Sequence, residues 1–192
     1  MKHFYLLRHT EFENPDNIFR GRLGLALSKE GKDHARRIGA WFKDKHISKI
    51  YSSAVERCKA TAEIVAQSID VPVVFDKRLL EVMHAIQGMN LIEYRKDRNK
   101  RYSLVDTLGG ESMMDVQVRM LDFFYEAVKR DEGNSIICSH GDGLYFLYLA
   151  LVGKNLPEKV GTIDRSEYQE KGTVRRIDVE GDQITVGSIE KL

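Results

Sequence analysis

Short apolar runs recur along the chain at lengths that are typical of buried β-strands. The first is Phe4-Tyr5-Leu6-Leu7, inside a predicted strand over residues 2–7. Near the end of the chain, two further runs surround Glu180-Gly181-Asp182, which is typical of the turn of a β-hairpin. The other predicted strands cover residues 47–51, 71–75, 135–138, 173–179 and 183–189.

Between these runs, apolar residues recur with the spacing of amphipathic helices. Ser28 is suited to cap the first predicted helix, and the pair Ser112 and Asp115 resembles a capping box before a later one. Residues 141–151 are apolar on all sides, which predicts a buried helix. The stripes that define the other helices are Ala35, Ile38 and Phe42; Val55, Cys58, Ala62, Val65 and Ile69; and Val116, Met120, Phe123 and Ala127.

Two segments lack this periodicity. Residues 10–27 contain Pro15, Gly21 and Gly24 and are predicted to form a long loop. Residues 79–108 are irregular, and the part over 84–108 is predicted as an excursion from the sheet. Because strands alternate with helices elsewhere, we predict an α/β fold: a three-layer αβα sandwich with a mostly parallel central sheet, helices on both faces and a C-terminal hairpin at or near an edge. All of residues 1–192 are expected to form one domain.

Composition limits the possible functions. The chain is 42% hydrophobic and 31% charged, which suits a soluble domain with a sizeable core. A net charge of +1 gives no general attraction for nucleic acid or for a membrane surface, so any affinity for anions must be local. The longest apolar run, residues 144–152, is far shorter than the roughly 20 residues that span a bilayer. With no apparent signal peptide and only two cysteines, we expect a cytoplasmic protein.

Two histidines follow predicted strands directly. His9 comes just after the first apolar run, and His140 follows the predicted strand over residues 135–138. Ligands of open α/β sheets bind beyond the carboxyl ends of the strands, so the two imidazoles are expected to share one site. An unprotonated imidazole is a good nucleophile near neutral pH, which points to covalent catalysis.

Two arginines and one acid complete a candidate site for phosphoryl transfer. Arg8 adjoins His9, and Arg57 lies at the start of the helix that follows the second predicted strand. Guanidinium groups bind phosphate oxygens bidentately and keep their charge. Glu81 follows the third predicted strand, where a carboxylic acid can protonate a leaving group. Each of these residues alone has an ordinary alternative as an ion-pair, turn or surface residue, and only their joint occurrence at strand ends favours the site.

Five motifs in this order resemble those of the histidine phosphatase superfamily, in its phosphoglycerate mutase-like branch. They are Leu7-Arg8-His9-Thr10-Glu11, Leu27-Ser28-Lys29-Glu30-Gly31, Ser52-Ser53 with Arg57 and Thr61-Ala62, Gly110-Glu111-Ser112, and Ser139-His140-Gly141. The resemblance spans about residues 3–150. It implies a two-step mechanism without metal or other cofactor, in which His9 becomes a phosphohistidine.

The same resemblance assigns roles to the other catalytic residues. Arg8, Arg57 and His140 would hold the phosphoryl oxygens, with His140 preferably protonated. Glu81 would protonate the leaving group and then activate water. Asp142 is the weaker candidate for the acid, because Gly141 separates it from His140. The predicted substrate-binding residues are Arg8, Thr10, Asn14, Arg20, Gly21, Arg57, His140 and Gly141.

Several positions depart from the family pattern. Thr10 replaces the usual glycine and would add a hydroxyl near the phosphate, and Asn14 lies one position earlier than the family's phosphate-contacting asparagine. Arg20 stands where glutamine is frequent, and with Arg22 it would favour a more anionic substrate. A solvated loop is the equal alternative for both of these arginines.

Other polar residues receive less weight. His84 is expected to be incidental or to line the substrate pocket. The basic stretch over residues 95–101 is more typical of a solvated face than of a clamp for an anionic substrate or nucleic acid. Cys138 lies close to His140 in sequence, but a thiol inside a strand is usually inert, so no Cys-His nucleophile is expected.

We therefore predict a phosphatase that hydrolyses phosphomonoesters of small metabolites. The alternatives are a cofactor-dependent phosphoglycerate mutase and a non-catalytic module that binds a phospholigand. Only 27 residues separate Glu81 from Gly109, whereas the family's mutases have a larger excursion here, which favours hydrolysis. The expected partner is a small phosphorylated substrate or inorganic phosphate, with no nucleic acid, membrane, metal or cofactor. Assembly with a second copy of the chain as a homodimer is left open.

Overall fold

The apolar run at the start of the chain forms β1 (Lys2–Arg8), an interior strand of a six-stranded sheet. The computed structural model describes all 192 residues, and its strand order is β3-β2-β4-β1-β5-β6. β1 is parallel to β4 (Asn134–Ser139), β4 is parallel to β2 (Ile47–Ser52), and β2 is parallel to β3 (Val73–Phe75). The predicted parallel core of the sheet is confirmed, although β3 begins two residues later than expected.

The predicted hairpin is also confirmed. β5 (Thr173–Glu180) runs antiparallel to β1, and β6 (Gln183–Lys191) runs antiparallel to β5 and forms one edge of the sheet. Gly181 in the turn has a positive φ of 58°, a backbone conformation that glycine adopts without steric penalty.

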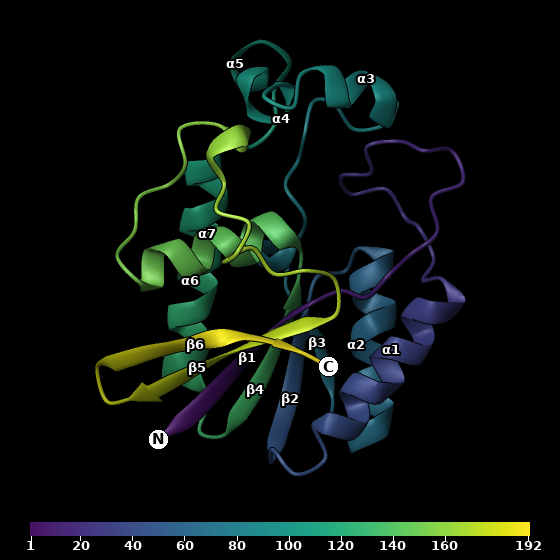
Figure 1. Cartoon of the computed structure of the whole chain (residues 1–192). Helices are drawn as coiled ribbons and strands as arrows, with labels where there is room; N and C mark the ends of the chain where they lie inside the picture. The colour runs from purple at the N-terminus through teal and green to yellow at the C-terminus, as the bar shows by residue number, and fades with distance from the viewer.

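Helices cover both faces of the sheet, as predicted (Figure 1). α1 (Lys29–Trp41) and α2 (Glu56–Ile69) lie on one face, and α6 (Met113–Arg130) and α7 (Gly141–Leu151) lie on the other. These layers make the three-layer αβα sandwich that the sequence predicts.

The side chains of β1 explain why its sequence is apolar without alternation. Tyr5 and Leu7 belong to the buried cluster that includes residues of α1 and α2, whereas Phe4 and Leu6 belong to the cluster with α6 and α7. Successive side chains of a strand point to opposite faces, so a strand between two helical layers must be apolar at every position.

The predicted helix caps are present. The Gly31 amide donates to Ser28 Oγ at 3.0 Å at the start of α1. At the start of α6, Ser112 and Asp115 form a reciprocal capping box. Each cap satisfies amides that have no partner inside the helix.

The excursion lies where the sequence places it, but the prediction that it is irregular is wrong over much of its length. Its polypeptide forms α3 (Leu91–Lys96), α4 (Lys100–Ser103) and α5 (Val105–Leu108), which stand together at the top of Figure 1. None of these short helices contains a fully buried residue, so they have no apolar stripe by which to recognise them.

The remaining connections are short or extended. The predicted loop over residues 10–27 contains only isolated bridges, Phe12 with Leu27 and Ile18 with Asn90. Two single turns, η1 (Lys77–Leu79) and η2 (Val160–Thr162), occur in the connections before Glu81 and before β5. No helix in the structure is both long enough and apolar enough to cross a bilayer.

Candidate active site

The two strand-end histidines lie together, as the sequence predicts. β1 and β4 are parallel neighbours in which Arg8 is in register with Ser139, so both strands end side by side at the same edge of the sheet. The His9 amide donates to the Ser139 carbonyl at 3.2 Å, and the His9 and His140 rings lie 5.3 Å apart.

The surroundings of His9 fix its protonation and its orientation. Its Nδ1 lies 2.8 Å from the Thr10 carbonyl, which can only accept, so Nδ1 carries the proton and Nε2 carries the lone pair. Burial and the charges of Arg57 and Arg8 hold the pKa of His9 well below its ordinary value. His9 is therefore a neutral imidazole with Nε2 available as a nucleophile.

Arg57 joins the groups of the site. Its Nε–H donates to His9 Nε2 at 3.2 Å, and its Nη2 donates to His140 Nδ1 at 3.0 Å. The same Nη2 lies 3.3 Å from Glu81 Oε2 and 2.9 Å from the Gly21 carbonyl. The planar guanidinium thus points its donors at the place where both imidazoles and the carboxylate converge.

Glu81, which follows η1, lies beside Arg57 and His140. Its Oε2 lies 3.5 Å from His140 Nδ1, and its Oε1 accepts from the Val82 amide at 3.0 Å. Burial raises the pKa of Glu81, but the charges of Arg57 and Arg101 oppose this, and the net pKa is lowered. Glu81 is therefore ionised before a substrate binds.

His140 does not have the protonation state that the sequence analysis expects. The side chain is fully buried, and burial together with the charges of Arg57 and Arg8 lowers its pKa well below the ordinary value. Its Nδ1 accepts from Arg57, and its Nε2–H donates to Ser53 Oγ at 2.9 Å. The expectation of a protonated His140 is wrong for the ligand-free protein, because protonation would add a buried positive charge beside those of Arg57 and Arg8.

Arg8 and Gly141 lie against each other. Arg8 Nη1 donates to the Gln169 carbonyl at 2.8 Å, while its Nε is buried without a hydrogen-bond partner. A Cβ atom at Gly141 would lie 3.0 Å from Arg8 Cζ and 2.2 Å from Tyr168 Oη. Gly141 therefore leaves the space that Arg8 and Tyr168 occupy, and it does not itself line the cavity.

Besides Gly141, three predicted binding residues do not line the cavity: Thr10, Asn14 and the fully buried His140. Thr10 is buried, and its hydroxyl lies 3.2 Å from Thr61 Oγ1 on α2. Asn14 bonds with its side chain to the backbone of Ile18, at 3.3 and 3.4 Å. The predictions of a substrate contact for Thr10 and Asn14 are wrong for this conformation, since each side chain is used to hold the loop.

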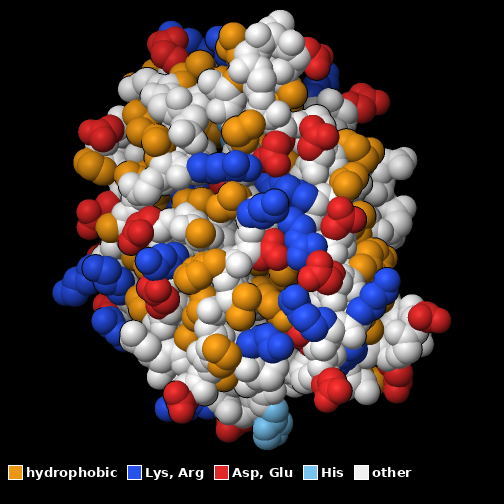
Figure 2. Space-filling view, turned by 180° about the vertical axis from the view of Figure 1, so that it is seen from behind, with side chains coloured by type: hydrophobic (Ala, Val, Ile, Leu, Met, Phe, Trp, Pro, Cys, Tyr) orange, Lys and Arg blue, Asp and Glu red, His pale blue; other side chains and the backbone are white.

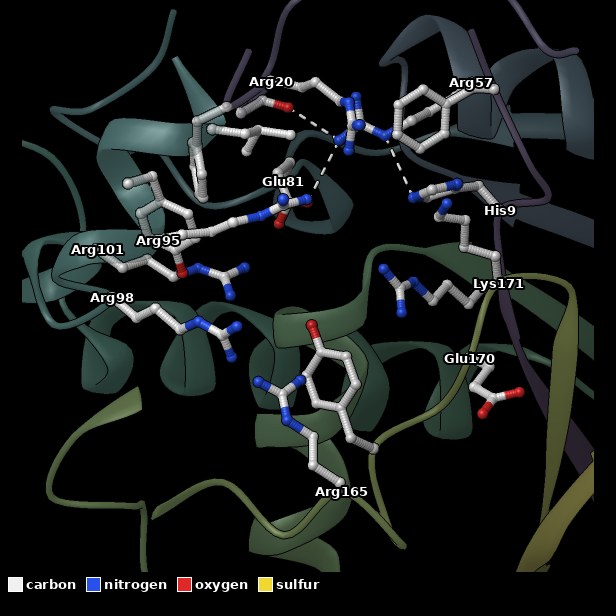
Figure 3. A pocket seen from close by; sticks show the side chains of 17 residues that line it. His9, Arg20, Arg57, Glu81, Arg95, Arg98, Arg101, Arg165, Glu170 and Lys171 are labelled. Carbon is white, nitrogen blue, oxygen red and sulfur yellow. Dashed lines mark hydrogen bonds and ion pairs between the residues drawn. The ribbon is translucent and has the colours of Figure 1, made fainter. Parts of the chain in front are cut away.

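A cavity of about 460 Å³ opens in front of His9 (Figure 3). Arg20 and Gly21 line it, as predicted, whereas Arg22 turns aside to pair with Glu111. Seven arginines and one lysine line the cavity, against two glutamates. The full lining is Arg8, His9, Phe12, Phe19, Arg20, Gly21, Arg57, Glu81, Leu91, Tyr94, Arg95, Arg98, Arg101, Arg165, Tyr168, Glu170 and Lys171.

The basic stretch over residues 95–101 is largely exposed, as predicted for a solvated face, but three of its arginines also line this cavity. Arg95, Arg98 and Arg101 extend from the same wall toward the middle of the cavity (Figure 3). His84 supports this wall: it is buried, packs against Phe19 at 5.1 Å between ring centres, and bonds to the Arg101 carbonyl at 3.0 Å.

The segment between α7 and β5 supplies cavity residues that sequence reasoning missed. They are Arg165, Tyr168, Glu170 and Lys171. No local motif marks this segment, and it reaches the site only because β5 pairs with β1 next to His9.

Cys58, and not Cys138, is the thiol that lies against the imidazole of His140. Its Sγ is 3.4 Å from His140 Nε2. Burial and the neighbouring Cys138 raise the pKa of the Cys58 thiol well above its ordinary value, so it stays protonated. This agrees with the prediction that no Cys-His nucleophile is present.

The chain is similar to known proteins in both sequence and structure. The sequence matches the family model of the histidine phosphatase superfamily, branch 1, over residues 4–190. It is 30% identical over 161 residues to phosphoserine phosphatase 1 of Hydrogenobacter thermophilus, covering 79% of this chain and 76% of that protein. A probable phosphoglycerate mutase of Salmonella paratyphi A is 28% identical over 186 residues, 88% of this chain and 86% of the relative. YhfR of Bacillus stearothermophilus, a solved structure, gives a TM-score of 0.82 at 27% identity and covers 98% of this chain and 96% of its own.

Proposed function

Because the chain belongs to the histidine phosphatase superfamily, branch 1, we propose that it hydrolyses phosphomonoesters of small metabolites through a phosphohistidine at His9. The tautomer and position of His9 support this proposal most directly. Its Nδ1 proton is held by the Thr10 carbonyl, and its Nε2 faces the cavity beside Arg57.

In the first step, the lone pair of His9 Nε2 attacks phosphorus and the ester P–O bond breaks. Arg8 and Arg57 bind the equatorial oxygens, whose charge is the main quantity to be stabilised in phosphoryl transfer. The Nδ1–H···O contact to Thr10 stabilises the positive charge that His9 acquires. The products of this step are a phosphohistidine and an alcohol.

Glu81 supplies the proton for the leaving oxygen. The carboxylate is ionised in the ligand-free protein, but a phosphoryl dianion beside it would raise its pKa and favour the protonated form. The same dianion would favour protonation of His140, whose Nδ1 would then donate to a phosphoryl oxygen.

In the second step, water attacks the phosphohistidine while Glu81, now ionised, accepts a proton from it. The P–N bond breaks, inorganic phosphate leaves and His9 is again neutral. The chemistry needs no metal ion or redox cofactor, as the family resemblance implies.

The proposal is tested with p-nitrophenyl phosphate in the presence of a chelator. His9→Ala should abolish phosphate release, and His3→Ala, at the far end of the same strand, should retain it. Full activity of His9→Ala would overturn the assignment of the nucleophile.

A mutase remains the second candidate, because a cavity with eight cationic side chains also suits a phosphoglycerate, which carries both a phosphate and a carboxylate. The short excursion favours hydrolysis over transfer. Incubation with 3-phosphoglycerate and its bisphosphorylated primer separates the two activities: release of inorganic phosphate supports a phosphatase, and isomerisation without release supports a mutase.

A further inference from the structure

Arg8 lines the cavity without an acidic partner there. Of the two acids that line the cavity, Glu81 pairs with Arg57. The other, Glu170, pairs with Lys191. Eight cationic side chains line the same cavity, and like charges at short range repel one another. Electrostatic repulsion therefore disfavours the position of the Arg8 guanidinium, so neutral groups of the protein must hold it there.

This crowding of positive charge is a local feature of the molecule. The whole chain has a net charge of only +1, yet Lys and Arg side chains form a band through the middle of the face drawn in Figure 2. A long cationic side chain in such surroundings turns toward solvent unless an acceptor fixes it. The groups that fix Arg8 are therefore part of what enables the cavity to bind a phosphoryl group.

Two groups of the segment over residues 165–172 hold Arg8. Its Nη1–H donates to the Gln169 carbonyl at 2.8 Å, and its Cζ lies 5.4 Å from the centre of the Tyr168 ring. The Arg8 Nε is buried and has no partner in the protein, so it remains available for a phosphoryl oxygen. The Gln169 carbonyl thus orients the guanidinium without using all of its donors.

The side chain of Gln169 connects this segment to the strand that carries Arg8. Residues 165–172 form no helix or strand, so no regular hydrogen-bond pattern fixes them. The Gln169 Nε2 donates to the Leu6 carbonyl on β1 at 3.0 Å and to the Thr173 carbonyl on β5 at 3.1 Å. Because Gln169 is only 2% exposed, water does not compete for these bonds. The residue therefore bonds Arg8 with its backbone and β1 with its side chain.

Neighbouring contacts fix the segment in other directions. The Tyr168 hydroxyl donates to Asp142 Oδ1 at 2.6 Å, which connects the segment to α7. The Gly172 amide donates to the carbonyls of Arg8 and His9, each at 3.1 Å, just before β5 begins. The Gln169 side chain is the contact that joins β1 to the residue whose carbonyl holds Arg8.

The unpaired oxygen of Gln169 indicates that its two donors are required. Its Oε1 is buried without a hydrogen-bond partner, although buried polar groups are nearly always bonded. The assignment of Nε2 as the donor is firm, because both of its partners are carbonyls and can only accept. A methionine of similar length would fill the space without an unpaired oxygen, but it would lose both bonds.

We propose that Gln169 is a positioning residue of the active site. Its side-chain amide joins residues 165–172 to β1, and its carbonyl thereby keeps the Arg8 guanidinium directed at the phosphoryl group. This inference rests on the proposed function and adds to it a residue that does not line the cavity and touches no reacting atom. A carbonyl suits this role because it orients Arg8 without neutralising its charge, as a carboxylate would.

The test is a double-mutant cycle between Gln169 and Arg8. Gln169→Met removes both donors at nearly constant volume. It should lower kcat/KM for p-nitrophenyl phosphate by about tenfold and raise the Kd of orthovanadate, a phosphate analogue, by a similar factor. In the Arg8→Gln background the same substitution should change either quantity by less than about twofold, because the guanidinium that Gln169 positions is absent. Where the activity of Arg8→Gln is too low to measure, the Kd values complete the cycle.

Gln117→Met is the matched control. The Gln117 Nε2 makes the same kind of bond, to the Phe146 carbonyl at 2.9 Å between α6 and α7, and neither residue lines the cavity. This variant should keep near wild-type kcat/KM and Kd even where a thermal melt shows that it loses as much stability as Gln169→Met. If Gln169→Met does not fold, Gln169→Asn, which keeps the amide but shortens it by one methylene group, takes its place in the cycle.

Two results would overturn the proposal. One is an additive cycle, in which the Gln169 substitution has the same effect with and without Arg8. The other is an equal loss of kcat/KM in the Gln117 and Gln169 variants. Either result would show that Gln169 contributes only to the general stability of the fold.

The two proposals fail separately. If His9-dependent hydrolysis occurs and the cycle is additive, Gln169 is not a positioning residue and the phosphatase assignment stands. If no phosphomonoester is hydrolysed, the cycle is measured by calorimetric titration with orthovanadate. Coupling between Gln169 and Arg8 then supports the positioning role, whereas additive losses or no binding contradict it.

Discussion

Asp142 Oδ2 lies 2.6 Å from Arg101 Nη2, and this pair joins the start of α7 to the excursion. The Asp142 carboxylate is completely buried, and it also accepts hydrogen bonds from Tyr102 and Tyr168. One carboxylate thus connects three segments that surround the cavity. The Asp142 carboxylate makes these structural contacts and does not line the cavity. This supports Glu81, and not Asp142, as the acid that protonates the leaving group.

Substitution of Asp142 by Asn tests this connection. The variant leaves Arg101 buried without its counterion, so the free energy of unfolding should fall by about 3 kcal/mol. Asp33→Asn removes an acid from an exposed ion pair and should cost about 0.5 kcal/mol or less. Urea denaturation measures both, and equal losses would show that Asp142 has no special structural role.

Arg57→Lys tests whether the planar guanidinium is required. Lysine keeps the charge but cannot reach His9, His140 and Glu81 from one planar group, so kcat/KM should fall by about 100-fold or more. Arg78→Lys, in an ion pair with Asp76 away from the cavity, is the control and should keep near wild-type activity. Wild-type activity of Arg57→Lys would contradict the proposed role of the planar guanidinium.

Gly141→Ala tests the close approach of Arg8 and Tyr168. The new methyl group would lie 2.2 Å from Tyr168 Oη, so one or both side chains must move. We expect a loss of stability of about 1–3 kcal/mol and a clear loss of kcat/KM. At Gly161 a methyl group meets nothing within 4 Å, so Gly161→Ala should change activity little. Full activity of Gly141→Ala would show that Arg8 need not keep its position.

The protonation of His9 predicts the acid limb of the pH profile. The nucleophile must be neutral, so kcat/KM is lost as the pH falls through the pKa of His9. Because burial and the charges of Arg57 and Arg8 lower that pKa well below 6.5, the limb should lie well below pH 6.5. The profile is measured with an aryl phosphate and corrected for the ionisation of the substrate. A corrected limb centred near pH 6.5 would contradict the buried, neutral His9.

Those parts of the site that follow strands directly could be predicted from the sequence. His9, His140 and Arg57 occur where apolar runs end or the next helix starts, and parallel strands bring such positions to one edge. Side-chain direction could not be predicted in the same way. Thr10 adjoins the nucleophile in sequence, yet its hydroxyl is directed to Thr61 on α2.

The cavity residues outside the strand ends could not be predicted, because their position in the cavity depends on contacts between distant segments. Arg98 and Arg165 come from polar segments without a periodic pattern, and only the folded chain shows that they line one cavity. Short helices such as α3 also escape prediction, since they bury no residue completely. Likewise, the neutral state of His140 follows from its own burial and from the charge of Arg57 beside it, which the sequence does not show.

The most direct test of the account is to find the phosphoryl group on His9. Wild-type protein is mixed with substrate, quenched in alkaline denaturant, which preserves phosphohistidine, and analysed by peptide mass spectrometry. We predict one acid-labile phosphoryl group on His9, present in His3→Ala and absent from His9→Ala. Turnover with no phosphoryl group on His9, or with one on another residue, would contradict the mechanism.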